Sequence, residues 1–335
     1  MRRFSQILLF SVIIGLSMGM GWAGTVQGSE KRQTVTYRLK WLFNVSVAGD
    51  LYATAEHLFQ RNGLDVTIKE GGPERDAIKE LELGYADFGV ASADQVIRAR
   101  TKRAPVVVLA QLFQSNPLQW IYHPDRLKIE RIADLRGRVV CVTFGGNDEA
   151  ILRTLLANGG LGERDVTLFS VRYDYTPFYR KQVDIWPVYR NAQGVILADK
   201  LNNEGETVAF LDPAKFGVIF VANSVVASER TTRTRPDLVR RFLRGLMQGW
   251  MNAMKPTNHD AVIDLLQRYD PDTPPRILEA QLAMTRRMVR PTPEFAIGTL
   301  DVDGWRQTEA IMLKQRLIAS PVSIEQALRP DFLPE

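Results

Sequence analysis

The chain has 335 residues, of which 45% are apolar and 24% are charged. These proportions are ordinary for a globular protein and exclude a wholly disordered, collagen-like or coiled-coil chain. One cysteine, Cys141, excludes an internal disulfide, and three widely separated histidines do not favour a metal centre. The net charge of +5 is spread along the sequence, which does not favour a nucleic-acid partner.

The first 28 residues have the features of an export signal. Arg2 and Arg3 precede an apolar run at 7–23, and small residues follow it. This order is typical of a signal peptide, here cleaved after Ala23 or after Gly28. A membrane anchor is the alternative, but the run is shorter than the roughly 20 residues that a spanning helix needs. No cysteine follows the run, so we expect a periplasmic protein that is not a lipoprotein.

Strands and helices alternate in the next part of the chain. Strands are expected at 34–41, 64–69, 86–92 and 105–110, and helices at 47–61, 74–83 and 94–102. The continuous apolar run at 105–110 is typical of a buried parallel strand. This alternation predicts a parallel sheet with helices on both faces.

The same rhythm restarts at residue 138. Strands are expected at 138–144, 166–171, 183–188 and 207–211, and helices at 147–158, 177–182 and 193–201. The apolar stretch at 216–228 then returns the chain to the first unit. Helices are expected at 236–254, 261–269, 275–289 and 302–317. The sequence therefore predicts two α/β units and a helical C-terminal extension.

Aromatic and polar residues gather at the carboxyl ends of the predicted strands. In doubly wound sheets these ends border the ligand crevice. The candidate ligand-binding residues found there are Trp41, Asn44, Ser92, Gly145, Gly146, Asn147, Glu149, Tyr173, Trp186 and Tyr189. Trp and Tyr side chains suit stacking on a flat ring. Ordinary packing in the core is the alternative for each aromatic residue.

Carboxylates at two predicted helix starts bear on the charge of the ligand. Asp94 opens one helix, and Asp148 and Glu149 open another. Helix N-termini attract anions, so these carboxylates compete with an anionic ligand and favour a ring that carries amino donors. Glu149 suits two N–H bonds from an amino-pyrimidine edge. The alternative is that Asn147, Asp148 and Glu149 only cap and charge the helix start.

No catalytic motif stands out. Metalloprotease and phosphate-loop patterns are absent, and the one G-x-S-x-G string, 15–19, lies inside the apolar leader. Cys141 stands in the middle of a predicted strand, where a small buried side chain is expected rather than a nucleophile. We therefore expect a protein without enzyme activity and without a cofactor.

Five short motifs follow one another in a specific order. They are Trp41-x-x-Asn44, Ala86-Asp-Phe-Gly-Val-Ala-Ser92, Ile132-Ala-Asp-Leu-Arg-Gly-Arg-Val-Val140, Arg235-Pro-Asp-Leu-Val-Arg-Arg-Phe-Leu243 and Asp331-Phe-Leu-Pro334. Together they resemble the periplasmic substrate-binding proteins of ABC importers. The branch most similar holds the aliphatic-sulfonate binders and the thiamine-pyrimidine-precursor binders and synthases.

The resemblance implies a two-lobed type II binding-protein fold, α/β in class, with a doubly wound and mostly parallel sheet in each lobe. Lobe one is expected to comprise residues 29–117 and 225–335, and lobe two residues 118–224. It also implies ligand contacts at Trp41, Asn44, Gly145, Gly146, Glu149 and Tyr189. The implied partners are a small-molecule ligand and an inner-membrane permease, with the protein itself a monomer.

Departures from the family pattern bear on the ligand. Phe43 replaces a proline, Val47 stands where a histidine is expected, and the segment 212–220 lacks cysteine. The synthases of the family use such a histidine and a cysteine-rich motif, so the resemblance favours a binding protein over a pyrimidine-precursor synthase. A planar nitrogen heterocycle is the expected ligand, and a sulfonate, taurine or nitrate anion is the alternative. A sensory role stays open beside import.

Overall fold

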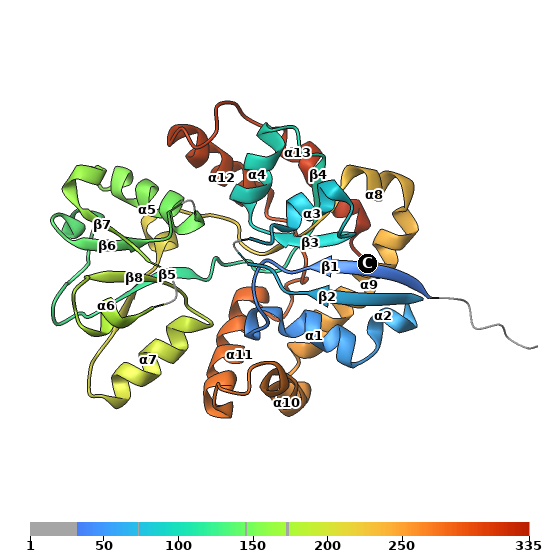
Figure 1. The fold of residues 1–335 in the computed structure, drawn as a ribbon, viewed down its shortest axis with the longest axis horizontal. Coiled ribbons are helices and arrows are strands. Elements are labelled where there is room, and N and C mark those ends of the chain that lie inside the picture. The colour runs from blue at the N-terminus through green and yellow to red at the C-terminus, as the bar shows by residue number, and fades with distance from the viewer. Residues whose placement is uncertain (1–31, 73, 145, 172–173, 335) are drawn as a thin grey trace, which may run out of the picture. The chain divides into compact units, whose positions relative to one another are not determined.

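The computed structural model describes residues 32–72, 74–144, 146–171 and 174–334. The signal peptide predicted at 1–28 lies outside the described residues, as do two candidate ligand-binding residues, Gly145 and Tyr173. Two five-stranded sheets organise the described chain (Figure 1).

The first sheet has the strand order β2-β1-β3-β10-β4. Its strands are β1 (Gln33–Arg38), β2 (Leu64–Lys69), β3 (Phe88–Ala91), β4 (Val106–Gln111) and β10 (Ser224–Ser228). The helices between its first four strands are α1 (Ala48–Ala55), α2 (Leu58–Arg61), α3 (Ala77–Leu83) and α4 (Ala93–Thr101). Strand β1 pairs in parallel with β2 and β3, whereas β10 runs antiparallel to both β3 and β4. The run at 105–110 is buried as expected, but its parallel pairing was wrong, because β10 inserts between β3 and β4.

The second sheet has the order β7-β6-β8-β5-β9. Its strands are β5 (Leu118–Tyr122), β6 (Val139–Val142), β7 (Thr167–Ser170), β8 (Ile185–Tyr189) and β9 (Ala209–Leu211), and its helices are α5 (Asn147–Asn158), α6 (Thr176–Tyr179) and α7 (Gln193–Asn203). Strand β6 is parallel to β7 and β8, and β5 is antiparallel to β8 and β9. Each described sheet is thus parallel apart from one strand, which confirms the predicted α/β class.

The chain crosses to the second sheet between β4 and β5 and returns between β9 and β10. Asn116 links the two crossings, because its Nδ2 donates to the Phe220 carbonyl at 2.9 Å while its Oδ1 accepts from the Leu118 amide. The chain from Arg32 onward forms one compact unit. The lobe boundaries at residues 117 and 225 stay a prediction.

The last third is helical, as the sequence predicts. Its helices are α8 (Glu229–Thr234), α9 (Pro236–Ala253), α10 (His259–Tyr269), α11 (Pro275–Val289), α12 (Val302–Lys314) and α13 (Ile324–Ala327). Pro236 occupies the first turn of α9, where a missing N–H costs nothing. The apolar stripe of α9 is buried from Leu238 to Trp250. Three elements, β5, α8 and α13, have no counterpart among the expected ones, and β10 lies in the apolar stretch 216–228, where no strand was expected.

The helix predicted at 47–61 is divided in the structure. A 3-10 turn, η1 (Val45–Val47), leads into α1, and α2 begins at Leu58. His57 lies between the two helices with a left-handed φ of 55°. Non-glycine residues adopt this conformation uncommonly, and no glycine or proline marks the position. The sequence pattern therefore gave no sign of the break.

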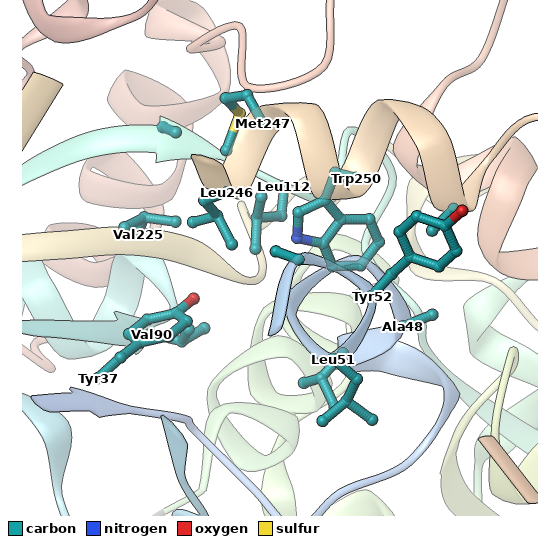
Figure 2. Packing of buried hydrophobic residues seen from close by; sticks show 14 of the residues in the cluster. Tyr37, Ala48, Leu51, Tyr52, Val90, Leu112, Val225, Leu246, Met247 and Trp250 are labelled. Atoms are coloured by element: carbon teal, nitrogen blue, oxygen red, sulfur yellow. The ribbon is translucent and has the colours of Figure 1, made fainter. Parts of the chain in front are cut away.

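Glycines bring α1 and α9 into close contact. A Cβ atom on Gly49 would lie 2.2 Å from Trp250 Cδ2, and one on Gly249 would lie 2.5 Å from Ala53 Cβ. Trp250 is fully buried, and Figure 2 shows its indole ring at the coil of α1. This packing holds α1 against α9, and with it the turn that precedes α1.

We expect Gly249→Ala to lower the free energy of unfolding by about 1–3 kcal/mol, because overpacking at a backbone contact forces the helices apart. Gly162→Ala is the control, since a Cβ atom there meets only Asp165 Oδ2, at 3.9 Å. Urea denaturation of the two variants measures the difference. Equal stability of both would contradict this account of the packing.

Asp50 in α1 is a fully buried carboxyl group. Its Oδ1 accepts a hydrogen bond from the Tyr37 hydroxyl at 2.7 Å. Burial raises the pKa of Asp50 to about 7, although the hydrogen bond from Tyr37 opposes the rise. An aspartate in an unfolded chain has a pKa of about 3.9. Between these two values the folded protein binds more protons than the unfolded chain.

The stability that protonated Asp50 contributes is present below about pH 4 and is lost as the pH rises through 7. We expect Asp50→Asn to remove this loss, because the amide does not titrate and still offers Tyr37 an acceptor. Urea midpoints of the wild type and the variant at pH 5 and pH 8 measure the effect. The same change in both proteins would show that Asp50 is not the titrating group.

Candidate functional site

The turn after β1 carries the half-buried Trp41 and is held by the segment after β2. The Phe43 amide donates to Glu70 Oε1 at 2.8 Å, and the Gly71 amide donates to the Trp41 carbonyl at 3.0 Å. A Cβ atom on Gly71 would lie 2.1 Å from the Leu39 carbonyl oxygen. Glycine at this position lets the two segments touch, so the turn has a fixed shape.

Asn44 shapes the same turn from within. Its Oδ1 accepts from the Ser46 amide at 2.8 Å and so caps η1, while its Nδ2 donates to the Leu42 carbonyl at 3.0 Å. Asn44 is half-buried, and Leu42 is 50% exposed. The structure therefore gives Asn44 a capping role beside the ligand contact that the sequence predicts.

Ser92 opens α4 and is fully buried. Its hydroxyl donates to Asp94 Oδ1 at 2.6 Å, and its amide donates to Gln95 Oε1 at 3.1 Å. Gln95 thereby completes a capping box at the helix start, and the Asp94 carboxylate is held by the Ser92 hydroxyl. Both side chains lie where the carboxyl end of β3 meets the helix.

The turn between β6 and α5 is closed by Asp148. Its buried carboxylate accepts from the Thr143 amide at 2.6 Å. A Cβ atom on Gly146 would lie 2.4 Å from Asp148 Oδ1, so this approach requires a glycine. Burial raises the pKa of Asp148 to about 6, against the lowering effect of the bond from Thr143. Asn147, half-buried, is the first residue of α5.

Glu149 is paired within its own helix. Arg153 donates to Glu149 Oε1 from Nε at 3.0 Å and from Nη2 at 2.6 Å. Arg153 also forms an ion pair with Glu163. A ligand that binds Glu149 must therefore share or replace the guanidinium contact.

The two aromatic candidates on β8 differ in their surroundings. Trp186 is 2% exposed and belongs to the core behind the second sheet, where its ring centroid lies 5.6 Å from that of Tyr175. Tyr189, at the end of the strand, is half-buried. The structure thus places Trp186 in the core, the alternative considered for each aromatic residue, and Tyr189 at the strand end.

Lys40 is a site residue that the sequence reasoning missed. Its Nζ donates to the Tyr189 hydroxyl at 3.3 Å, which joins the end of β1 to the end of β8. Burial lowers the pKa of Lys40, but its interactions with Tyr189, Asp94 and Asp148 raise it to a net value above the ordinary one. Lys40 is therefore a cation facing carboxylates from both sheets. The only signal in the sequence is its place directly before Trp41.

Two large apolar side chains are left exposed in the same turns. Leu42 follows Trp41, and Phe144, which is 53% exposed, follows β6. An exposed aromatic residue at the carboxyl end of a buried strand is unusual unless something packs against it. The site thus combines one cation, buried carboxylates, a phenol and apolar surface, which together can bind a flat ring with polar edges.

In the part of the chain that the structure describes, no group of three or more His, Cys, Asp or Glu side chains could hold a metal ion. Across the same residues, no helix combines the length and the apolar character needed to cross a bilayer.

The NMT1/THI5 like family model matches residues 44–258 of this sequence. The chain belongs to this family.

Two curated relatives extend along most of the chain. The chain is 26% identical over 316 residues to the riboflavin-binding protein RibY of Chloroflexus aurantiacus. This alignment covers 90% of the chain and 86% of RibY. The chain is 24% identical to the formylaminopyrimidine-binding protein of Halalkalibacterium halodurans, with 98% of both chains covered. Both relatives are named as binding proteins.

Solved structures show the same fold. The alkanesulfonate-binding protein SsuA of Xanthomonas axonopodis pv. citri, bound to MOPS, superposes with a TM-score of 0.67 at 19% sequence identity. The superposition covers 89% of this chain and 98% of the SsuA chain. The desulfurization enzyme DSZB superposes with a TM-score of 0.59 at 16% sequence identity. This superposition covers 90% of the present chain and 97% of the DSZB chain. The chain thus has the periplasmic-binding-protein fold, which the enzyme DSZB also has.

Proposed function

We propose that this protein binds a small planar nitrogen heterocycle between its two sheets and delivers it to an inner-membrane ABC permease. The observation that carries the proposal is the contact between Lys40 and Tyr189, because it brings ligand-facing turns of both sheets together. Binding between two sheets lets the ligand favour their closed arrangement, which a permease can recognise. The proposal includes no chemical change of the ligand.

The ligand class is supported by the relatives and by the surface of the site. Riboflavin and formylaminopyrimidine, which the two relatives are named for, both contain flat nitrogen rings. Leu42 and Phe144 offer exposed apolar surface to such a ring, and Trp41 and Tyr189 offer aromatic faces.

The polar groups have separate roles in this proposal. Lys40 donates a hydrogen bond to a ring carbonyl or ring nitrogen, and the Tyr189 hydroxyl forms a hydrogen bond with the ring edge. Glu149 accepts from an amino group after it exchanges its contact with Arg153. Trp186 supports β8 from the core behind Tyr189.

The predicted signal peptide and the fold support a periplasmic location. The relatives named as binding proteins support import of a solute. A monomer is the simplest state for such a protein.

A sulfonate-type anion is the second candidate ligand. The cation of Lys40 favours it, and SsuA shares the fold. The carboxylates of Asp94 and Asp148 oppose it, since both are buried near the same lysine.

Thermal unfolding of residues 29–335 with amino-pyrimidines, thiamine, riboflavin, taurine, alkanesulfonates and nitrate tests the ligand class. A ligand that binds only the folded state stabilises it by about 2.7 kcal/mol at a hundredfold excess over its Kd. We expect a rise of several degrees in Tm with heterocycles alone. A rise with sulfonates alone would contradict the proposal.

Two substitutions separate the candidates further by calorimetric titration. We expect Glu149→Gln to weaken heterocycle binding about tenfold, because a charged acceptor of amino hydrogens is lost. For an anion the same change should leave affinity equal or improve it. Lys40→Gln should weaken binding of an anion, which loses its opposite charge, more than binding of a neutral ring, which loses one hydrogen bond. Lys128→Gln, at a lysine whose side chain is 81% exposed, is the control. Unchanged heterocycle affinity in Glu149→Gln would remove Glu149 from the site.

A further inference from the structure

A line of buried polar contacts joins the second sheet to the first beside the candidate site. Asn191, fully buried, follows β8, and its Nδ2 donates to Ser46 Oγ in η1 and to Thr285 Oγ1 in α11, each at 3.0 Å. Gln281 Nε2 in α11 donates to the Ala192 carbonyl at 3.1 Å. We call these five residues the seam. Helix α11 packs against both η1 and α7, and Figure 1 shows α7 and α11 next to each other.

The hydroxyl of Thr285 fixes the orientation of the Asn191 amide. Thr285 Oγ1 donates its proton to the Gln281 carbonyl at 2.9 Å, so it can only accept from Asn191. The amide nitrogen therefore faces Thr285, and its two protons go to two hydroxyl oxygens. Asn191 Oδ1 is buried and, among the described residues, has no hydrogen-bond partner.

The seam combines a favourable and an unfavourable contribution to contact between the sheets. The closed seam gains two hydrogen bonds from one side chain but leaves a buried acceptor without a partner, which is unfavourable. If the sheets separate, both bonds break and water can reach Oδ1. The seam thus stabilises contact between the sheets without making it permanent.

The seam also connects the two turns that carry the candidate site. Ser46 belongs to the turn that Asn44 caps, and it follows Lys40 closely in the sequence. Asn191 stands two residues after Tyr189, and Ala192 is buried in the core of the first sheet. The contacts of the Asn191 amide thus link the segment that follows Tyr189 to the segment that follows Lys40.

We propose that Asn191 is a positioning residue that holds the turn after β8 against the turn after β1 and sets how far the two sheets close. This inference rests on the proposed function, since closure matters only if a ligand binds there. Asn191 itself touches no ligand in this account. The exposed ion pair between Arg276 and Asp199 also links α11 to α7, but such pairs contribute little.

The test measures closure in the protein without added ligand. Spin labels are attached at Lys128→Cys on the second-sheet side and Arg244→Cys on α9, both exposed positions. The native Cys141 is buried and should stay unlabelled. Label distances are compared for wild type, Asn191→Ala and Thr285→Val, with the Tm of each. Asn62→Ala is the matched control, because its Nδ2 bonds the Leu58 carbonyl within the first-sheet side.

We expect Asn191→Ala to lower the closed-to-open ratio about tenfold relative to the wild type, with a smaller shift in Thr285→Val. Asn62→Ala should keep the wild-type distribution. An unchanged distribution in Asn191→Ala, or an equal shift in Asn62→Ala, would overturn the inference.

The ligand panel distinguishes the two proposals. If the labels shift but no heterocycle binds, the proposed ligand fails and the seam stands. If heterocycles bind but the labels do not shift, the seam fails and the ligand stands.

Discussion

The close packing of α1 on α9 is the constraint on which the candidate site depends. Gly49 and Gly249 let the two helices touch, and Trp250 fills the space between them. Because α1 cannot shift, the turn before it presents Lys40 and Trp41 at a fixed place at the end of β1. Glu70 and Gly71 hold the same turn from the other side. The site residues are thus positioned by the core of the first sheet.

Electrostatics then decide what such a site accepts. Lys40 keeps its charge because Tyr189, Asp94 and Asp148 outweigh the effect of burial on its pKa. A lysine whose charge is already balanced by carboxylates attracts an anion less than an isolated lysine would. It still donates hydrogen bonds, which suits a neutral ring with acceptor atoms. The exposed side chains of Leu42 and Phe144 agree with a ring of this kind.

Much of the fold was predictable because strands and helices leave local patterns. The α/β alternation, the buried run at β4 and the apolar stripe of α9 all follow from residue spacing. Strand β5 was missed because the short segment from Leu118 to Tyr122 stands outside the expected alternation, and pairs only with strands from later in the chain. The break at His57 has no marker in the sequence at all.

The candidate site was predictable only in part. The strand ends named the turns that make up the candidate site, but Asn44, Ser92 and Glu149 all have internal partners that depend on local geometry. Lys40 and Asn191 were missed because their partners, Tyr189 and Ser46, lie 149 and 145 residues away. Such contacts arise from tertiary structure and leave no spacing to recognise.

The most direct test of the central claim is a crystal structure of the mature protein purified from the periplasm with whatever ligand it retains. We predict density for a flat ring between the turns after β1 and β8, with polar atoms in hydrogen-bond range of Lys40 Nζ and Tyr189 Oη. A tetrahedral anion at Lys40, or a ligand bound away from both turns, would contradict the account.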